Sequence, residues 1–243
     1  FSGLNNLEDI TLAPEFSALC GYTDEDVDTV FAAELEGLDR EAIRRWYNGY
    51  NWLGEGVYNP FDILQLFKRR EFKNYWFETG TPTFLVNLLF KRQVPTLTLD
   101  NLLSSSAMLS SFDVEQIDTE ALLFQTGYLT IKSSRRVGGQ IYYTLGYPNQ
   151  EVFQSLNESL LSIMVEDKGS QSHNSIALYD LLLVNDFEGL KTLFQSFFAS
   201  IPYHWYTNND IQRYEGYYAS VFYSYFAALG LTVIVEDCTN HGR

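Results

Sequence analysis

The feature of this sequence that most constrains its fold is a short β-hairpin set between helices. Apolar residues recur at helical spacing over 119–125, and strand patterns follow over 128–132 and 140–145. The glycine-containing run 133–139 between the two strands predicts a turn. Another helix is predicted after Asn149. The order helix, hairpin, helix is typical of a winged-helix fold.

Most of the remaining chain shows helical spacing, and Gly, Asn, Asp and Pro residues mark where the helices begin and end. The predicted helices run over residues 24–35, 40–47, 60–67, 81–90, 175–184, 186–200 and 210–229, with Ile63, Leu64, Leu66 and Phe67 as the buried stripe of the third. Asp24 or Thr23 is expected to cap the first of them, and Asp39 the second. A strand is predicted over 231–237, and the polar residues 169–174 predict a break between two parts, 1–168 and 175–243. We therefore expect a mainly α chain with a small β component (α+β).

The charge of the chain bears on its partners. The net charge is −15, and residues 1–39 contain no Lys or Arg. Such a chain repels phosphate backbones unless a local basic patch intervenes, and Lys132, Arg135 and Arg136 in the hairpin are candidates for weak nucleic-acid binding. The sequence has two Cys, no long apolar run and no visible signal peptide. We therefore expect a cytoplasmic protein with no membrane partner and no disulfide framework.

Several catalytic motifs do not occur in the sequence. It contains no Gly-x-x-x-x-Gly-Lys-Ser/Thr, His-Glu-x-x-His, Cys-x-x-Cys or Gly-x-Ser-x-Gly run, and its three His are scattered. The string Pro60-Phe-Asp62 followed by Glu71-Phe-Lys73 imitates a metal-dependent nuclease site. Asp62, however, falls in the first turn of a predicted helix, where an acid suits the helix dipole. We interpret the string as a chance match.

Glu215 is the acid that stands out. It shares a predicted apolar stripe of the last helix with Tyr218, Phe222 and Phe226. A carboxylate on such a stripe is costly to bury unless it is paired or binds a metal ion. The alternative is a partly exposed Glu near the helix N-terminus, stabilised by the helix dipole. The residues alone leave both interpretations open.

Several stretches, taken in order, resemble one family. They are Phe1–Leu12, Leu19–Thr23, Trp46–Tyr50, Val57–Phe61, Tyr75–Pro82, Phe124–Thr130 and Leu145–Asn149. Together they resemble the bacterial predicted AAA-ATPase-like proteins that carry a PD-(D/E)XK nuclease-like domain at the C-terminus. The resemblance covers almost the whole chain, although none of these stretches is itself catalytic.

The resemblance implies an arrangement of domains. A P-loop ATPase core would precede Phe1, residues up to about 100 would form a helical lid-like region, and residues near 119–165 would form a winged-helix-like part. The last helix and strand would begin a nuclease-like α/β core. Its metal-binding Asp and Glu-x-Lys strand would follow Arg243, so the chain is expected to be truncated at both ends.

The resemblance also implies a function for the full-length protein. Glu215 would belong to an incomplete catalytic site, so this fragment is expected to be inactive and to bind no metal by itself. ATP and Mg²⁺ are expected as cofactors of the full-length protein, where Arg44 or Arg45 could reach the nucleotide. That protein would then process nucleic acid under nucleotide control. The alternatives are a non-enzymatic interaction or regulatory module, or weak DNA binding through the hairpin.

Overall fold

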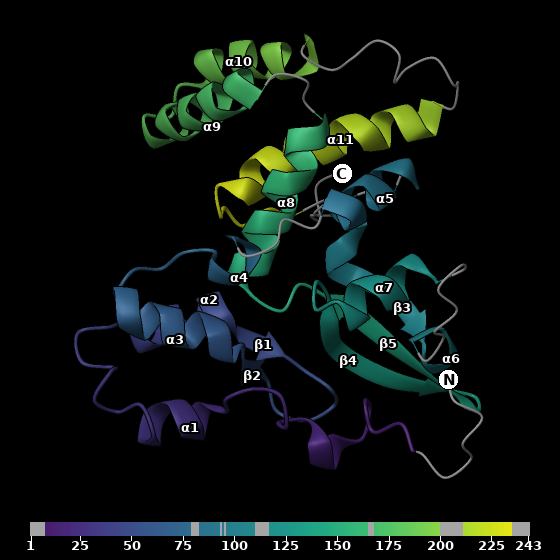
Figure 1. Ribbon diagram of the computed structural model, residues 1–243. Coiled ribbons are helices and arrows are strands. Elements are labelled where there is room, and N and C mark those ends of the chain that lie inside the picture. The colour runs from purple at the N-terminus through teal and green to yellow at the C-terminus, as the bar shows by residue number, and fades with distance from the viewer. Residues whose placement is uncertain are drawn as a thin grey trace, which may run out of the picture. The chain divides into compact units, whose positions relative to one another are not determined.

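The computed structural model describes residues 8–78, 83–92, 94, 96–109, 117–164, 168–199 and 211–234. Over these residues the chain is mainly α with a small β component, which confirms the predicted fold class (Figure 1). It divides into two compact units: the first is Phe1–Thr79 with Asp100–Val152, and the second is Gly80–Leu99 with Phe153–Arg243. The predicted parts 1–168 and 175–243 concern the domains of a longer protein and stay a prediction. None of the described helices is long and apolar enough to cross a membrane.

The first unit combines short helices with two small antiparallel sheets. Its helices are η1 (Pro14–Phe16), α1 (Asp24–Thr29), α2 (Arg40–Tyr47), α3 (Pro60–Arg69), α4 (Tyr75–Glu78), α6 (Ser106–Leu109) and α7 (Thr119–Gln125). Its strands are β1 (Asn48–Tyr50), β2 (Val57–Tyr58), β3 (Leu102–Ser105), β4 (Thr130–Val137) and β5 (Gln140–Gly146). Helix α8 (Gln150–Met164) begins in this unit and continues into the second, and η2 (Thr96–Asn101) also belongs to both.

Side-chain caps fix where α1, α2 and α3 begin. The Thr23 hydroxyl accepts the backbone N–H of Asp26, whose carboxylate accepts the N–H of Thr23 in return. The Asp39 side chain accepts two first-turn N–H groups of α2. The Asn59 side chain accepts one N–H group of α3, whose first residue is Pro60. These residues satisfy N–H groups that lack a partner within the helix. The helix starts predicted at Arg40 and Pro60 are confirmed, and of the two caps predicted for the first helix the structure has Thr23.

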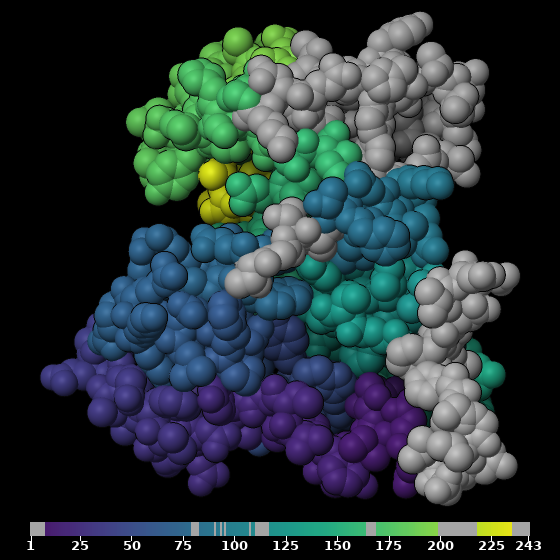
Figure 2. Space-filling model, in the orientation of Figure 1, coloured from purple at the N-terminus to yellow at the C-terminus, as the bar shows by residue number. Residues whose placement is uncertain are grey.

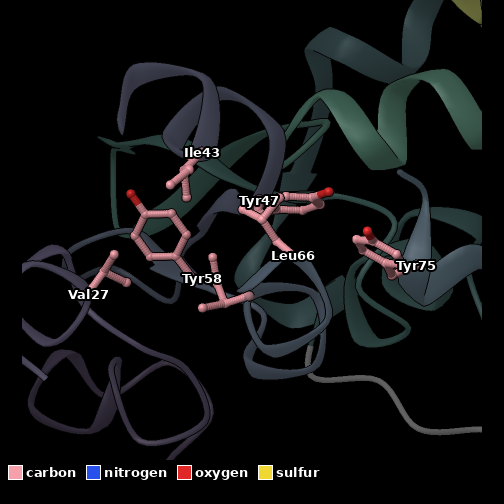
Figure 3. Packing of buried hydrophobic residues seen from close by; sticks show 7 residues of the cluster. Val27, Ile43, Tyr47, Tyr58, Leu66 and Tyr75 are labelled. Atoms are coloured by element: carbon pink, nitrogen blue, oxygen red, sulfur yellow. The ribbon is translucent and has the colours of Figure 1, made fainter. Parts of the chain in front are cut away.

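A hydrophobic core joins α1, α2 and α3 in the first unit (Figure 3). Its fully or nearly fully buried members are Val27, Ile43, Tyr47, Tyr58, Ile63, Leu66 and Tyr75. The Tyr47 hydroxyl lies at the edge of this core and donates to the carbonyl of Lys73 at 2.9 Å. The predicted burial of Ile63 and Leu66 is confirmed, whereas that of Leu64 is wrong. Leu64 is exposed because it points about 160° away from the buried Leu66 around the helix axis.

The larger sheet has the strand order β3–β5–β4, with both neighbouring pairs antiparallel. Residues predicted as a turn over 133–139 continue strand β4 as far as Val137, which pairs with Gln140. The turn itself is Gly138–Gly139, and Gly138 has φ +61°, a conformation that glycine adopts readily. The predicted hairpin is confirmed, but its turn is shorter than expected because pairing with β5 persists to the tip.

The second unit is built from helices α5 (Thr83–Lys91), α9 (Lys168–Leu183), α10 (Phe187–Ala199) and α11 (Ile211–Ala228), with most of α8. The ring of Tyr225 in α11 stacks on Phe197 in α10 with centroids 3.8 Å apart. Phe194 of α10 packs against Phe222 with centroids 4.6 Å apart. These aromatic contacts hold α10 against α11.

Three predicted element bounds are wrong. The helix from Asp24 ends at Thr29, and the carbonyls of Glu34 and Glu36 beyond it accept hydrogen bonds from Arg70. The polar break predicted at 169–174 lies inside α9, because its polar residues find partners there: Asn174 is buried and donates to the Tyr225 hydroxyl at 3.3 Å. Residues 231–234 form no strand, since no described strand lies beside them to pair. Residues 235–237 of that predicted strand lie outside the described residues.

Candidate functional site: a buried carboxyl pair

The most unusual chemical group of the first unit is a pair of carboxyl side chains, Asp62 and Glu151, both fully buried. Asp62 lies in the first turn of α3, on the same face as Ile63 and Leu66. Glu151 is the second residue of α8, where the Asn149 side chain accepts the N–H of Val152 at 3.1 Å. Two helix N-termini from distant parts of the sequence therefore bring two acids together.

The carboxyl pair has fewer hydrogen-bond donors than its four oxygens could accept from. Oε1 of Glu151 accepts the backbone N–H of Trp76 at 2.8 Å. If both groups are counted as ionised, neither oxygen of Asp62 nor Oε2 of Glu151 has a donor. The two carboxyl groups lie within hydrogen-bonding reach of each other. One proton held between them supplies the missing donor, as in other carboxyl dyads.

The electrostatics of the pair favour that proton. Burial raises the pKa of Asp62 to about 6, and hydrogen bonding with the Glu151 carboxyl group limits the rise. Burial, and then the charge of Asp62, raise the pKa of Glu151 far above its usual range. Among the described residues no Lys or Arg acts on either carboxyl group. At neutral pH the folded pair therefore carries one negative charge and one proton.

Polar groups from the neighbouring strands and loops border the pair. The buried Tyr50 hydroxyl lies close enough that burial, followed by the charges of Asp62 and Glu151, raises its pKa. Asn149 is also buried. Gly49, next to Tyr50, has φ +121°, and a Cβ there would lie 2.0 Å from the carbonyl oxygen of Pro148. Strand β1, which contains Gly49, and the loop before α8, which contains Pro148, therefore meet backbone to backbone.

The stretches that carry the family resemblance converge here. Tyr50, Trp76 and Asn149, from three different stretches, lie around the two acids. A fourth stretch supplies Thr130, whose hydroxyl accepts the N–H of Asn51 at 2.7 Å. The same stretch includes Tyr128, whose ring lies 5.2 Å from that of Trp76. In the described residues these four stretches contribute to the interior of the first unit.

A second charged group lies on the surface of the first unit and contains a predicted site residue. Asp24 accepts hydrogen bonds from the Tyr58 hydroxyl at 2.7 Å and from Nη2 of Arg40 at 2.7 Å, and Arg44 also pairs with it. Partial burial works to raise the pKa of Asp24, but these hydrogen bonds and the arginine charges outweigh it and lower the pKa. Nε of Arg40 also contacts Asp28 at 2.6 Å. Arg44 is thus held in place by an ionised carboxylate.

Arg44 and Arg45, the residues predicted to lie near a nucleotide, lie side by side in α2 but have different partners. The side chain of Arg44 is 54% exposed and bound to Asp24. The Nε of Arg45 donates to the Gln150 side chain at 3.1 Å. Only Arg44 therefore combines an exposed guanidinium with a carboxylate that positions it.

The basic residues of the hairpin do not gather on one face. Arg135 and Arg136 are exposed and follow each other in β4, so their side chains point to opposite sides of the sheet. Lys132 lies at the register shift of β4, with its side chain over Gly146 beside Asp100. Loss of hydration lowers the pKa of Lys132, and the charge of Asp100 opposes that effect. The prediction that these three residues bind nucleic acid stays a prediction.

The predicted nuclease residues are placed as follows. Glu215 lies in α11, but its side chain is outside the described residues. Its predicted stripe continues at Tyr218 and Phe222, which are half-buried, whereas the fully buried line of α11 runs through Val221 and Tyr225. Glu71 and Lys73 form an exposed ion pair at 3.0 Å. Because Asp62 is buried beside Glu151, it forms no site with Glu71 and Lys73.

The described residues do not fit a resident Mg²⁺ ion. Nowhere in them do three His, Cys, Asp or Glu side chains group closely enough to hold a metal. His173 is exposed in α9, and His204 and His241 lie outside the described residues. Cys20 is exposed with a free thiol, and Cys238 lies outside the described residues.

The sequence analysis missed the carboxyl pair, although a signal for it was present. The third helix has its buried apolar residues at 63 and 66, and Asp62 falls on that same face. An acid on an apolar stripe is the same pattern as at Glu215, but at Asp62 the position in the first helical turn also agrees with a helix-dipole residue. Its partner Glu151 gave no such signal, since periodicity cannot relate two residues so far apart along the chain.

Comparison with known proteins adds one relative. The chain is 63% identical, over all 243 of its residues, to a protein of Azotobacter chroococcum mcd 1 described as an uncharacterized protein in the vnfD 5′ region. The match covers 47% of that protein, so the chain spans about half the length of the curated relative that it matches. No family model matches the chain, and no solved structure matches it.

Proposed function

We propose that this chain is the nucleotide-responsive, non-catalytic region of a longer ATPase-like protein with a nuclease-like domain, and that Arg44 is its contact with the nucleotide. The observation that carries the proposal is the geometry of Arg44. It presents an exposed guanidinium, and Asp24 fixes its direction while Tyr58 and Arg40 fix Asp24. Arginine is the side chain best suited to form bidentate hydrogen bonds with phosphate oxygens.

The chemistry of the network suits a switch. A nucleotide phosphate offers the same kind of oxygen ligands as Asp24, so it could replace Asp24 as the partner of Arg44. Arg40 would keep Asp24 paired after such an exchange, because it holds the other carboxylate oxygen. The structure of α1 and α2 could then respond to the nucleotide without leaving a charge unpaired. The relative's greater length agrees with a further part of the protein that would bind the nucleotide.

Equilibrium binding of Mg-ATP to the full-length protein tests this proposal. One charge-assisted hydrogen bond contributes about 1.5–3 kcal/mol. We therefore expect Arg44→Ala to weaken ATP binding roughly 10- to 150-fold. Arg45→Ala is the matched control, since it removes the neighbouring arginine of the same helix, and it should leave affinity unchanged. Equal affinities for wild type and Arg44→Ala would refute the role of Arg44.

The nuclease activity is part of the same proposal and has its own test. We expect this 243-residue chain to cleave no nucleic acid with Mg²⁺ or Mn²⁺, and robust cleavage would contradict the proposal. In the full-length protein, divalent-dependent cleavage should be abolished by Glu215→Gln, which keeps the shape of the side chain and removes its charge. Unchanged cleavage would exclude Glu215 from the active site.

Weak DNA binding through the hairpin is the second candidate. The strand order β3–β5–β4, with α6 and α7 between β3 and β4, agrees with a winged-helix arrangement. The charges favour it less, since α7 carries Glu120 and no basic residue, and Arg135 and Arg136 point to opposite faces. Gel shifts at low and moderate salt with both arginines replaced by Ala test it. Binding that is lost in the double variant would support the hairpin.

A further inference from the structure

Helix α9 carries an apolar strip on its exposed side. Ile176, Tyr179 and Leu183 follow each other at spacings of three and four residues and so share one face. Val184 and Phe187 extend this strip around the turn into α10. These five side chains, called the α9 strip below, are between 47% and 75% exposed. Figure 2 shows the α9–α10 hairpin in green on the surface of the molecule.

The fold of the hairpin does not use this strip. The buried residues of α9 are Gln171, Asn174 and Leu178, on the opposite side of the helix. Where the two helices of the hairpin approach each other, a Cβ on Gly189 would lie 2.5 Å from the Leu181 side chain. Packing within the second unit is therefore satisfied by other residues. An apolar strip that serves no internal packing is typical of a surface that binds another protein.

Acidic side chains lie beside the α9 strip and favour a basic partner. Asp180, Asp186 and Glu188 are exposed among and next to its residues. Asp186 also accepts the Gly189 N–H at 2.9 Å and so has a fixed position. Lys191 is the nearest basic residue along the chain after the strip. A second copy of a chain with net charge −15 would bring like charges together, whereas Lys or Arg on a partner would complement these acids.

We infer that the α9 strip binds an amphipathic helix of a partner protein, whose apolar face is flanked by Lys or Arg. Apolar residues of that helix at positions i, i+3 and i+7 would pack along Ile176, Tyr179 and Leu183. Its basic residues would face Asp180 and Glu188 at the border. This inference does not depend on the nucleotide proposal, because Arg44 lies in the other unit.

Fluorescence anisotropy on the full-length protein tests the inference with a labelled 14-residue helix of Leu and Lys, arranged so that Leu occupies one face. We expect saturable binding that weakens at least tenfold in the Leu183→Ser, Phe187→Ser double variant. Phe84→Ser is the matched control: Phe84 of α5 in the same unit is 74% exposed, and its replacement should leave binding unchanged. A scrambled peptide of the same composition should bind more weakly, since it has the charge without the apolar face.

Three results would overturn the inference. Equal binding of the ordered and scrambled peptides would show attraction by net charge alone. Self-association of the full-length protein that the double variant abolishes would show that a second copy occupies the strip. Absence of binding at any concentration, with the strip protected from solvent in hydrogen exchange, would show that another part of the same protein covers it.

Discussion

The buried pair of Asp62 and Glu151 makes the stability of the first unit depend on pH in a direction opposite to that of an ordinary ion pair. In the unfolded chain both acids ionise near pH 4. In the folded chain one of them keeps its proton because burial and the neighbouring charge raise its pKa. Between about pH 6.5 and 8 the folded state thus binds one proton more than the unfolded state. Its free energy of unfolding falls by about 1.4 kcal/mol for each pH unit as the pH rises.

The substitution Glu151→Gln removes this dependence. Its amide oxygen still accepts the N–H of Trp76, and its amide N–H₂ can donate to Asp62 in place of the shared proton. Wild type should lose about 2 kcal/mol between pH 6.5 and 8 from this pair, whereas the variant should lose none of it. At pH 8 the variant should therefore be the more stable protein, by about 1–3 kcal/mol.

Urea unfolding of both proteins at several pH values measures the difference, in which the titration of all other groups cancels. Glu41→Gln is the control, because Glu41 is an exposed acid of α2 and its replacement makes the same Glu-to-Gln change away from the pair. Parallel pH profiles of wild type and Glu151→Gln would refute the shared proton. A melting temperature that Mg²⁺ or Ca²⁺ raises in wild type but not in the variant would show that a cation, not a proton, joins the two acids.

Three further predictions follow from the first and second units. Gly49→Ala should destabilise the protein by about 3 kcal/mol or more, since φ is +121° and the new Cβ would meet the Pro148 carbonyl, while Gly139→Ala at an open position should change the melting temperature little. Asp24→Asn should lower the free energy of unfolding by ~1 kcal/mol at pH 7. Because folding lowers the pKa of Asp24, wild type should lose this advantage over the variant as the pH falls below about 4, and acid unfolding followed by circular dichroism measures the loss. Phe197→Ala should lower the free energy of unfolding by about 3–5 kcal/mol, because it removes the ring that stacks on Tyr225. Phe198→Ala, at a more exposed position, should have a small effect when both variants are compared by thermal unfolding.

Local chemistry is what the sequence predicts well in this protein. Asp39 and Pro60 mark helix starts, and the first helix start is marked by Thr23 or Asp24, because these signals involve only residues of the same turn. Gly127 and Gly230 mark helix ends for the same reason, with φ near +80° and +73°. The hairpin is recognisable because two strand patterns flank two adjacent glycines.

Long-range partners are what the sequence does not predict. The length of β4 depends on how far β5 continues to pair, and the helicity of residues 169–174 depends on the Tyr225 hydroxyl that Asn174 meets. The burial of Asp62 depends on Glu151, which lies on a helix far along the chain. Each of these outcomes is decided by a contact between residues that no short pattern relates.

Hydrogen exchange of the full-length protein with and without Mg-ATP tests the central claim most directly. If Arg44 contacts the nucleotide, amides of α1 and α2 should become more protected in the presence of Mg-ATP, because Arg44 then ties α2 to the bound phosphate while Arg40 still ties Asp24 of α1 to α2. Arg44→Ala should remove that protection, whereas Arg45→Ala should retain it. Exchange in α1 and α2 that is identical with and without Mg-ATP, at a concentration where binding is saturated, would contradict the claim.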